Sequence, residues 1–143
     1  MLDFKFNWDS TIDTGIEEID IQHKELFRIG RAVEQFVITR CISMEQKQVL
    51  DIICSLREYV AYHFYEEEHL MELHNISGLE KHREEHNRLR KLIQSIDPRK
   101  FNNHPYEQMV KLKDEITEIV FCHILSTDKE MAKELQEKIK QAS

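Results

Sequence analysis

Histidine and acidic residues interrupt the apolar faces of the predicted helices, and this feature limits most strongly what the chain can fold into. His63 and Glu67 are four residues apart, so on a helix their side chains share one face. An imidazole and a carboxylate on a buried face are costly without a partner, and a metal ion is one such partner. The two residues continue this apolar series: Val49, Ile52, Ile53, Leu56, Tyr59, Val60, Leu70 and Met71.

The length and composition narrow the class of protein. A chain of 143 residues suits one domain, here residues 1–143, and three Gly and two Pro favour long helices over a many-stranded sheet. A net charge of -7 without a basic stripe predicts no nucleic-acid partner and no anionic membrane. We find no apolar run of the roughly 20 residues that a membrane span needs, and no secretory leader pattern. We therefore expect a cytoplasmic monomer with reduced cysteines.

The apolar periodicity predicts an all-α fold, an antiparallel up-down-up-down four-helix bundle with an N-terminal arm and a short C-terminal helix. A capping box of Ser43 and Gln46 is expected to begin the second helix. The predicted segments are an arm at 1–18, a bundle at 19–126 with helices at about 19–39, 44–74, 79–96 and from 106, and a C-terminal helix at 127–143.

Further polar residues lie on the other predicted inward faces. His82 and His86 share a helix face at the i, i+4 spacing that is common in metal sites. Asp128 follows His123 by five residues, which on an ideal helix is about 140° away. The two can share a face only if the helix breaks, and a capping box of Thr127 and Glu130 is one place for such a break.

The inward polar set holds five imidazoles and two carboxylates, which are too many ligands for one zinc ion. Two iron ions bridged by carboxylates would use such a set. Burying five histidines without a metal would need five separate hydrogen-bonding solutions, so we favour the metal. The set comprises His23, His63, Glu67, His82, His86, His123 and Asp128.

Four ordered motifs in this set resemble the hemerythrin family, in its bacterial single-domain form (bacteriohemerythrin). The Trp8-Asp9 and Gly15-Ile16 pairs also look like the N-terminal arm of that family. The resemblance covers nearly the whole chain. The four motifs are Ile19 to Phe27 (IDIQHKELF), His63 to Glu67 (HFYEE), His82 to His86 (HREEH) and His123 to Asp128 (HILSTD).

The resemblance implies a site of two iron ions (Fe2+/Fe3+) with a bridging oxo or hydroxo group, at which dioxygen binds reversibly. The iron with two histidines would keep an open position for dioxygen. The implied ligands are His82, His86 and His123 for one iron, His23 and His63 for the other, and Glu67 and Asp128 as bridges.

An apolar shell around the open position would slow irreversible oxidation, because a dry pocket disfavours the loss of charged oxygen species. The candidates for this shell are Phe27, Phe64, Ile119 and Val120. Relatives often carry Trp-Leu where this chain has Ile119-Val120, so we expect a wider pocket and faster autoxidation here.

Three functions remain open at this point. The first is reversible dioxygen binding for storage, delivery or sensing, with no catalytic residue and no enzyme activity. The second is a di-iron enzyme acting on peroxide or nitric oxide, which would need an acid-base group such as Tyr59, Tyr62 or Cys122 facing the open position. The third is an iron-handling module without gas chemistry.

Overall fold

The computed structural model describes residues 6–142, apart from the side chains of Phe121 and Cys122, and is all-α, with no strand in that part of the chain. The all-helical prediction is therefore confirmed. The helices are α1 (Glu17–Ile38), α2 (Gln46–Leu73), α3 (Leu79–Gln94), α4 (Lys100–Asn103), α5 (Pro105–Glu118), the π-helical segment η1 (Ile119–Asp128) and α6 (Lys129–Ala142).

Local sequence explains where these helices begin. The first turn of α1 holds Glu17, Glu18 and Asp20, whose negative charges are favourable at the positive end of the helix dipole. The capping box of α2 is formed by Glu45 and Gln48, not by the predicted Ser43 and Gln46. Ser43 instead adopts a left-handed backbone with φ of 62° in the preceding turn, so the helix starts two residues later than predicted.

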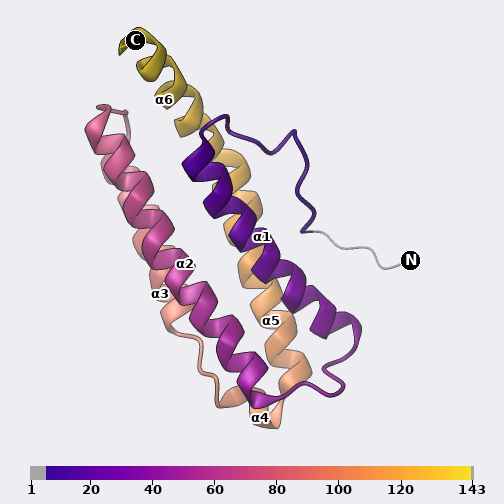
Figure 1. The fold of residues 1–143 in the computed structure, drawn as a ribbon. Coiled ribbons are helices and arrows are strands. Elements are labelled where there is room, and N and C mark those ends of the chain that lie inside the picture. The colour runs from indigo at the N-terminus through magenta and orange to yellow at the C-terminus, as the bar shows by residue number, and fades with distance from the viewer. Residues whose placement is uncertain (1–5, 143) are drawn as a thin grey trace.

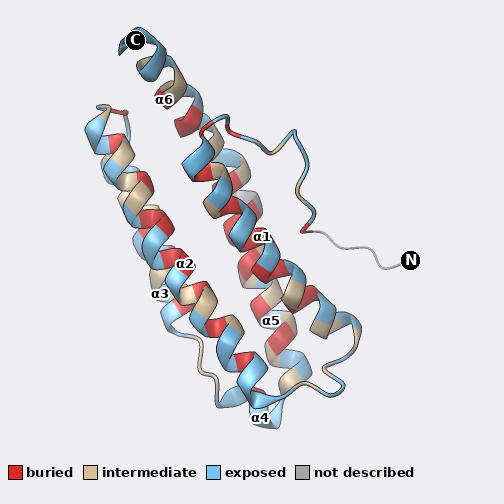
Figure 2. Ribbon diagram, in the orientation of Figure 1, coloured by how far each residue is buried: buried red, intermediate tan, exposed pale blue. Residues whose placement is uncertain are grey.

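The four long helices α1, α2, α3 and α5 lie side by side, and α6 extends from the far end of η1 (Figure 1). Helix α1 packs against α2 and α5, and α2 packs against α3. Buried positions follow the sides of the helices that face one another (Figure 2). The short helix α4 was not predicted, because its Asn- and Pro-rich surroundings resemble a loop; the buried Phe101 ties it to the core.

The described part of the N-terminal arm packs against helix α1. Phe6 is buried against the α1 backbone at Gly30, where even a Cβ atom would come within 2.8 Å of its ring. The rings of Phe6 and Trp8 both contact Phe27 edge-on, with centroids 6.2 Å and 5.1 Å from it. The arm therefore covers one of the predicted shell residues from outside.

The helix that carries His123 and Asp128 does not break, contrary to our expectation of a new helix capped by Thr127 and Glu130. Helices α5 and α6 are joined without interruption by η1, a ten-residue π-helix. In a π-helix each backbone N–H bonds to the carbonyl five residues earlier, so residues five apart come close to one face. The wider winding, and not a break, brings Asp128 onto the face of His123.

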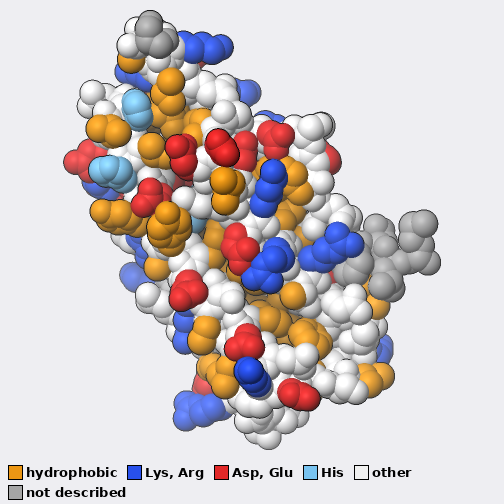
Figure 3. Space-filling view, in the orientation of Figure 1, with side chains coloured by type: hydrophobic (Ala, Val, Ile, Leu, Met, Phe, Trp, Pro, Cys, Tyr) orange, Lys and Arg blue, Asp and Glu red, His pale blue; other side chains and the backbone are white. Residues whose placement is uncertain are grey.

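The visible surface carries acidic and basic side chains in alternation, with no wide field of either sign (Figure 3). No helix in the described part of the chain combines the length and the apolar character needed to cross a bilayer. Several large apolar side chains are nevertheless exposed, and three of them lie near one another where α1 faces α2: Ile21, Tyr62 and Tyr65.

Candidate metal centre

The seven polar residues of the predicted inward faces meet at one place between the helices. Helix α1 contributes one of them, α2 two, α3 two and η1 two. Six have no exposed surface, and His82 is 4 % exposed. The side chains that the structure brings together are His23, His63, Glu67, His82, His86, His123 and Asp128.

The Asp128 carboxylate divides its two oxygens between two sets of histidines. Its Oδ2 lies 3.1 Å from Nε2 of His23 and 3.4 Å from Nε2 of His63. Its Oδ1 lies 3.1 Å from Nε2 of His82 and 3.0 Å from Nε2 of His123. One carboxylate thus faces two histidines with one oxygen and two others with its second oxygen.

The Glu67 carboxylate, on α2, also divides its two oxygens between two sets of histidines. Its Oε2 lies 3.2 Å from Nε2 of His63, while its Oε1 contacts His82 and lies 3.2 Å from Nε2 of His86. The ligand atoms therefore form two groups that share both carboxylates. We call them the three-histidine group (His82, His86 and His123) and the two-histidine group (His23 and His63).

The hydrogen bonds on the outer ring nitrogens show that a cation fits between these atoms. Nδ1 of His86 lies 2.9 Å from Glu68 Oε2, and Nδ1 of His123 lies 3.0 Å from Glu85 Oε1. A carboxylate only accepts, so each Nδ1 donates its proton, and in the neutral ring Nε2 is left with a lone pair. The two Nε2 atoms lie 3.0 Å apart. Two lone pairs at that distance repel each other unless a cation lies beside them.

The carboxylate of Glu67 leads to the same conclusion, that a cation fits at the centre. Glu67 is fully buried, and its Oε2 lies 3.2 Å from Nε2 of His63 without forming a well-aligned hydrogen bond. A buried carboxylate oxygen without a hydrogen bond is costly, and coordination to a metal ion removes that cost. Imidazole nitrogens together with carboxylate oxygens suit first-row transition-metal ions such as iron and zinc. Cys41 and Cys54 lie outside both ligand groups.

In the metal-free protein, protons take the place of the cation. Burial acts to lower the pKa of His63, but the charge of Glu67 and the hydrogen bond to Asp128 prevail and raise it to about 9. Burial likewise opposes the shift of His123, whose pKa the charge of Asp128 raises to about 10. For Glu67, burial and the charge of Asp128 act upward, yet the charge of His63 contributes to a net lowering of its pKa to about 2. The site thus favours positive charge at its centre.

The three-histidine group has a second layer of charged support. Glu68 accepts a hydrogen bond from Arg90 at 2.9 Å while it holds His86, and Arg83 lies 3.4 Å from its other oxygen. Glu85 accepts a hydrogen bond from the Thr127 hydroxyl at 3.3 Å. Outer partners of this kind hold ligating imidazoles in place and make them better donors.

The two-histidine group has a weaker outer layer. Nδ1 of His63 lies 2.7 Å from the amide oxygen of Gln22, which is neutral, and Nδ1 of His23 has no hydrogen-bond partner. Tyr59 is 6 % exposed and stacks on His63, with ring centroids 5.1 Å apart and planes 10° apart. Tyr62, by contrast, is 60 % exposed, and the Cys122 side chain lies outside the described residues.

The predicted shell residues are all buried in the main hydrophobic core. Phe27 is 4 % exposed, and Phe64, Ile119 and Val120 have no exposed surface. The Phe64 ring stacks on His86 with centroids 3.9 Å apart, so it also fixes the orientation of a candidate ligand. Their burial makes the surroundings of the centre apolar.

Sequence reasoning missed the residues that hold the histidines from outside, namely Gln22, Glu68 and Glu85. The available signal was weak. Each lies within three residues of a candidate ligand, but glutamate also fills the solvated helix faces of this chain. Only the packing of α1, α2, α3 and η1 shows which of these side chains point at a ring nitrogen.

Comparisons with known proteins agree with this geometry. A model of the hemerythrin HHE cation binding domain matches residues 14–135. The chain is similar to a bacteriohemerythrin of Clostridium acetobutylicum, with 26% identity over 125 residues that cover 87% of this chain and 97% of the relative. Hemerythrin-like proteins of Naegleria gruberi and Naegleria fowleri are 34% identical over 83 residues, or 58% of this chain and 61% of each relative. No solved structure matches the chain.

Proposed function

The chain belongs to the hemerythrin family, and on that premise we propose that it holds two iron ions at the centre between α1, α2, α3 and η1 and uses them to bind dioxygen reversibly. The family match confirms the resemblance of the motifs, and the proposal extends it to the chemistry of the site. The arrangement of the long helices supports, as part of the proposal, an antiparallel up-down-up-down four-helix bundle.

The proposed ligands follow the two groups of nitrogen atoms. The three-histidine group would hold one iron, the two-histidine group would hold the other, and Glu67 and Asp128 would bridge the pair. The division of each carboxylate's oxygens between the groups supports the bridging role.

The unequal number of histidines is the observation that carries the function. Both groups share the same two carboxylates, so the group with only His23 and His63 is one ligand short of the other. A coordinatively short ion keeps a position for an exogenous molecule. When bound, two ferrous ions supply the electrons that reversible dioxygen binding requires.

The residues around the centre keep water and protons away from that position. Phe64, Ile119 and Val120 have no exposed surface, and Phe27 is covered by the arm. A dry pocket disfavours the departure of a charged oxygen species and slows irreversible oxidation. These side chains therefore favour a binding protein over one that turns dioxygen over.

The enzyme alternative, action on peroxide or nitric oxide, would need an acid-base group beside the centre, and the buried Tyr59 is a candidate for that group. Burial and the charges of Asp128 and Glu67 raise the pKa of Tyr59 well above its usual range. A phenol with a raised pKa holds its proton, so it suits hydrogen bonding better than proton delivery. For this reason we place reversible binding first.

A visible spectrum tests the proposed function. The iron-loaded protein is reduced without air, exposed to air and then purged with argon. We expect a colourless sample that becomes coloured in air and bleaches on purging. A sample that turns directly to a stable diferric form would contradict reversible binding. Turnover of a reducing dye after peroxide addition to that form would support the enzyme alternative instead.

A further inference from the structure

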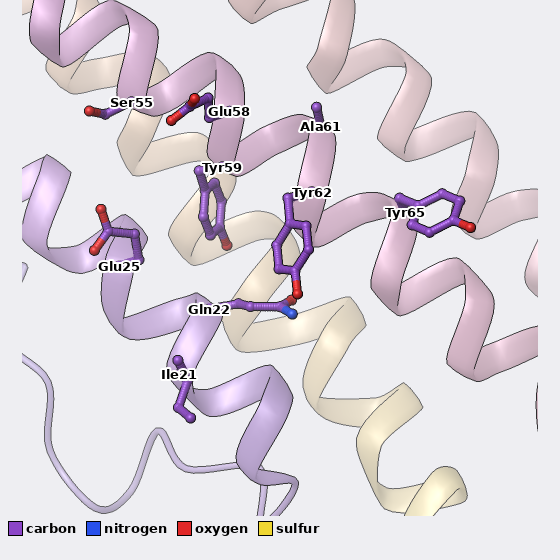
Figure 4. A pocket seen from close by; sticks show the side chains of 9 residues that line it. All are labelled: Ile21, Gln22, Glu25, Ser55, Glu58, Tyr59, Ala61, Tyr62 and Tyr65. Atoms are coloured by element: carbon purple, nitrogen blue, oxygen red, sulfur yellow. The ribbon is translucent and has the colours of Figure 1, made fainter.

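A surface pocket leads from solvent toward the two-histidine group. It has a volume of about 820 Å³ and lies where α1 faces α2 (Figure 4). At its outer edge stand the exposed side chains of Ile21, Tyr62 and Tyr65. Gln22 and Tyr59 also line it, and both contact His63. A small molecule in this pocket is therefore separated from a candidate ligand by a single layer of side chains.

The hydroxyl of Tyr59 is an unsatisfied group at the inner end of this route. The side chain is buried, and its oxygen has no hydrogen-bond partner. Tyr59 belongs to the main hydrophobic core cluster, together with Phe27, Phe64 and Val60. A buried hydroxyl without a partner is costly, whereas phenylalanine would fill nearly the same volume at no such cost.

The position of Tyr59 relates this hydroxyl to the open side of the centre. Tyr59 precedes His63 by one turn of α2, and the near-parallel stacking of the two rings places the phenol alongside the imidazole. Figure 4 shows its side chain pointing from α2 into the molecule, whereas Tyr65 points away. The phenol therefore lies beside the group that is one ligand short.

We propose that the Tyr59 hydroxyl donates a hydrogen bond to the exogenous molecule held at the two-histidine side of the centre. The ligands that fit are small hydrogen-bond acceptors of two or three atoms, namely dioxygen or a linear inorganic anion. The inference rests on the proposed function, because it needs an open position at that side. Tyr59 is thus a specificity-determining residue and not an iron ligand.

Azide binding to the iron-loaded, oxidised protein tests this role without measuring oxygen carriage. Azide is titrated into wild type, Tyr59→Phe and Tyr106→Phe, and binding is followed by visible absorbance. Tyr106 is a matched control because its phenol lies at the start of α5 under Arg40, outside the pocket and the centre. We expect Tyr59→Phe to bind azide about tenfold more weakly, which corresponds to one hydrogen bond to a charged acceptor. Equal affinity of all three proteins would overturn the proposal.

An isotope measurement adds a result that a merely structural role would not produce. The stretching vibration of bound azide is recorded in H2O and in D2O. We expect it to shift between the solvents in wild type and Tyr106→Phe, and to shift less in Tyr59→Phe. Absence of any shift in wild type overturns the proposal even if Tyr59→Phe fails to fold. Wild type that holds two irons but binds no azide would instead contradict the open position, and with it the proposed function.

Discussion

The three-histidine and two-histidine sides of the centre differ in more than their number of ligands. On the first side, His86 and His123 bond outward to the carboxylates of Glu68 and Glu85. On the second side, His63 bonds outward to a neutral amide and His23 has no outer partner. The side that is short of ligands also lacks the charged outer partners of the other side.

This difference gives the centre one half with charged outer support and one half without it. Carboxylate partners hold an imidazole in one orientation and increase its electron donation to a metal. Arg90 and Arg83 in turn hold Glu68, so the three-histidine side is supported through three layers. The two-histidine side lacks this support, and it is there that we propose an exogenous molecule meets Tyr59.

Because both sides of the centre share Glu67 and Asp128, changing one of these carboxylates should have the largest effect. Replacing Glu67→Gln removes the charge that both sides use, so we expect the iron content per chain to fall by more than half. Metal analysis after loading under identical conditions measures this. The neighbouring Glu66→Gln, which lies outside both ligand groups, should load normally. Full loading of Glu67→Gln would show that the carboxylate does not bridge.

The pH dependence of the metal-free protein is the next largest effect. The pKa values of His63 and His82 are raised to about 9 and that of His123 to about 10. Their stabilisation is present in full below the unfolded pKa of about 6.5 and is lost as pH rises through 9 to 10. Glu67, with a pKa lowered to about 2, loses its contribution only as pH falls below the unfolded value.

We therefore expect the free energy of unfolding of the chelator-treated protein to fall by a few kcal/mol between about pH 6 and about pH 10. Urea denaturation across this range measures it. Iron affinity should change in the opposite direction and rise with pH, because metal ions must displace the same protons. A metal-free protein whose stability is flat across this range would contradict the exchange of protons for metal.

Exchanging the charge of the outer partners, Glu68 behind His86 and Gln22 behind His63, tests the difference between the two sides more closely. Glu68→Gln removes the charge behind His86, and we expect the iron on the three-histidine side to be released about tenfold more readily. Gln22→Glu places a charge behind His63, so we expect the iron on the two-histidine side to be released less readily. Competition with a chelator measures both. The exposed Glu137→Gln in α6 is the control. Identical behaviour of all three variants would remove any distinction between the sides.

The smallest expected effect concerns the apolar shell. Ile119→Trp combined with Val120→Leu should slow the decay of the oxygenated protein several-fold by narrowing the pocket. Both residues are fully buried in the core, so the added volume should also lower stability by about 1–3 kcal/mol. Absorbance decay in air and thermal unfolding measure the two effects. If the decay rate is unchanged although stability falls, the shell does not control autoxidation.

Much of the site was predictable because it follows helical spacing. The i, i+4 relation of His63 with Glu67 and of His82 with His86 places each pair on one face whatever the tertiary structure. The all-helical class and the family were confirmed. The division into arm, bundle and C-terminal helix and the iron-binding roles of the seven residues stay predictions.

The relation of His123 to Asp128 was wrongly explained, because the sequence offered a plausible capping box at Thr127 and Glu130. Single-residue propensities do not reveal a π-helix, which exists where tertiary contacts compensate its poorer backbone geometry. The seven converging side chains around η1 supply such contacts.

The sequence by itself determined which side chains turn inward, because helix periodicity is a local property of the chain. Only the tertiary structure decided which of those side chains contact one another and which have outer hydrogen-bond partners. The split of the Glu67 and Asp128 oxygens, the outer partners Glu68 and Glu85, and the unpartnered phenol of Tyr59 depend on how separate helices are rotated against one another. That rotation is set by the packing of the whole core, which no single stretch of sequence contains.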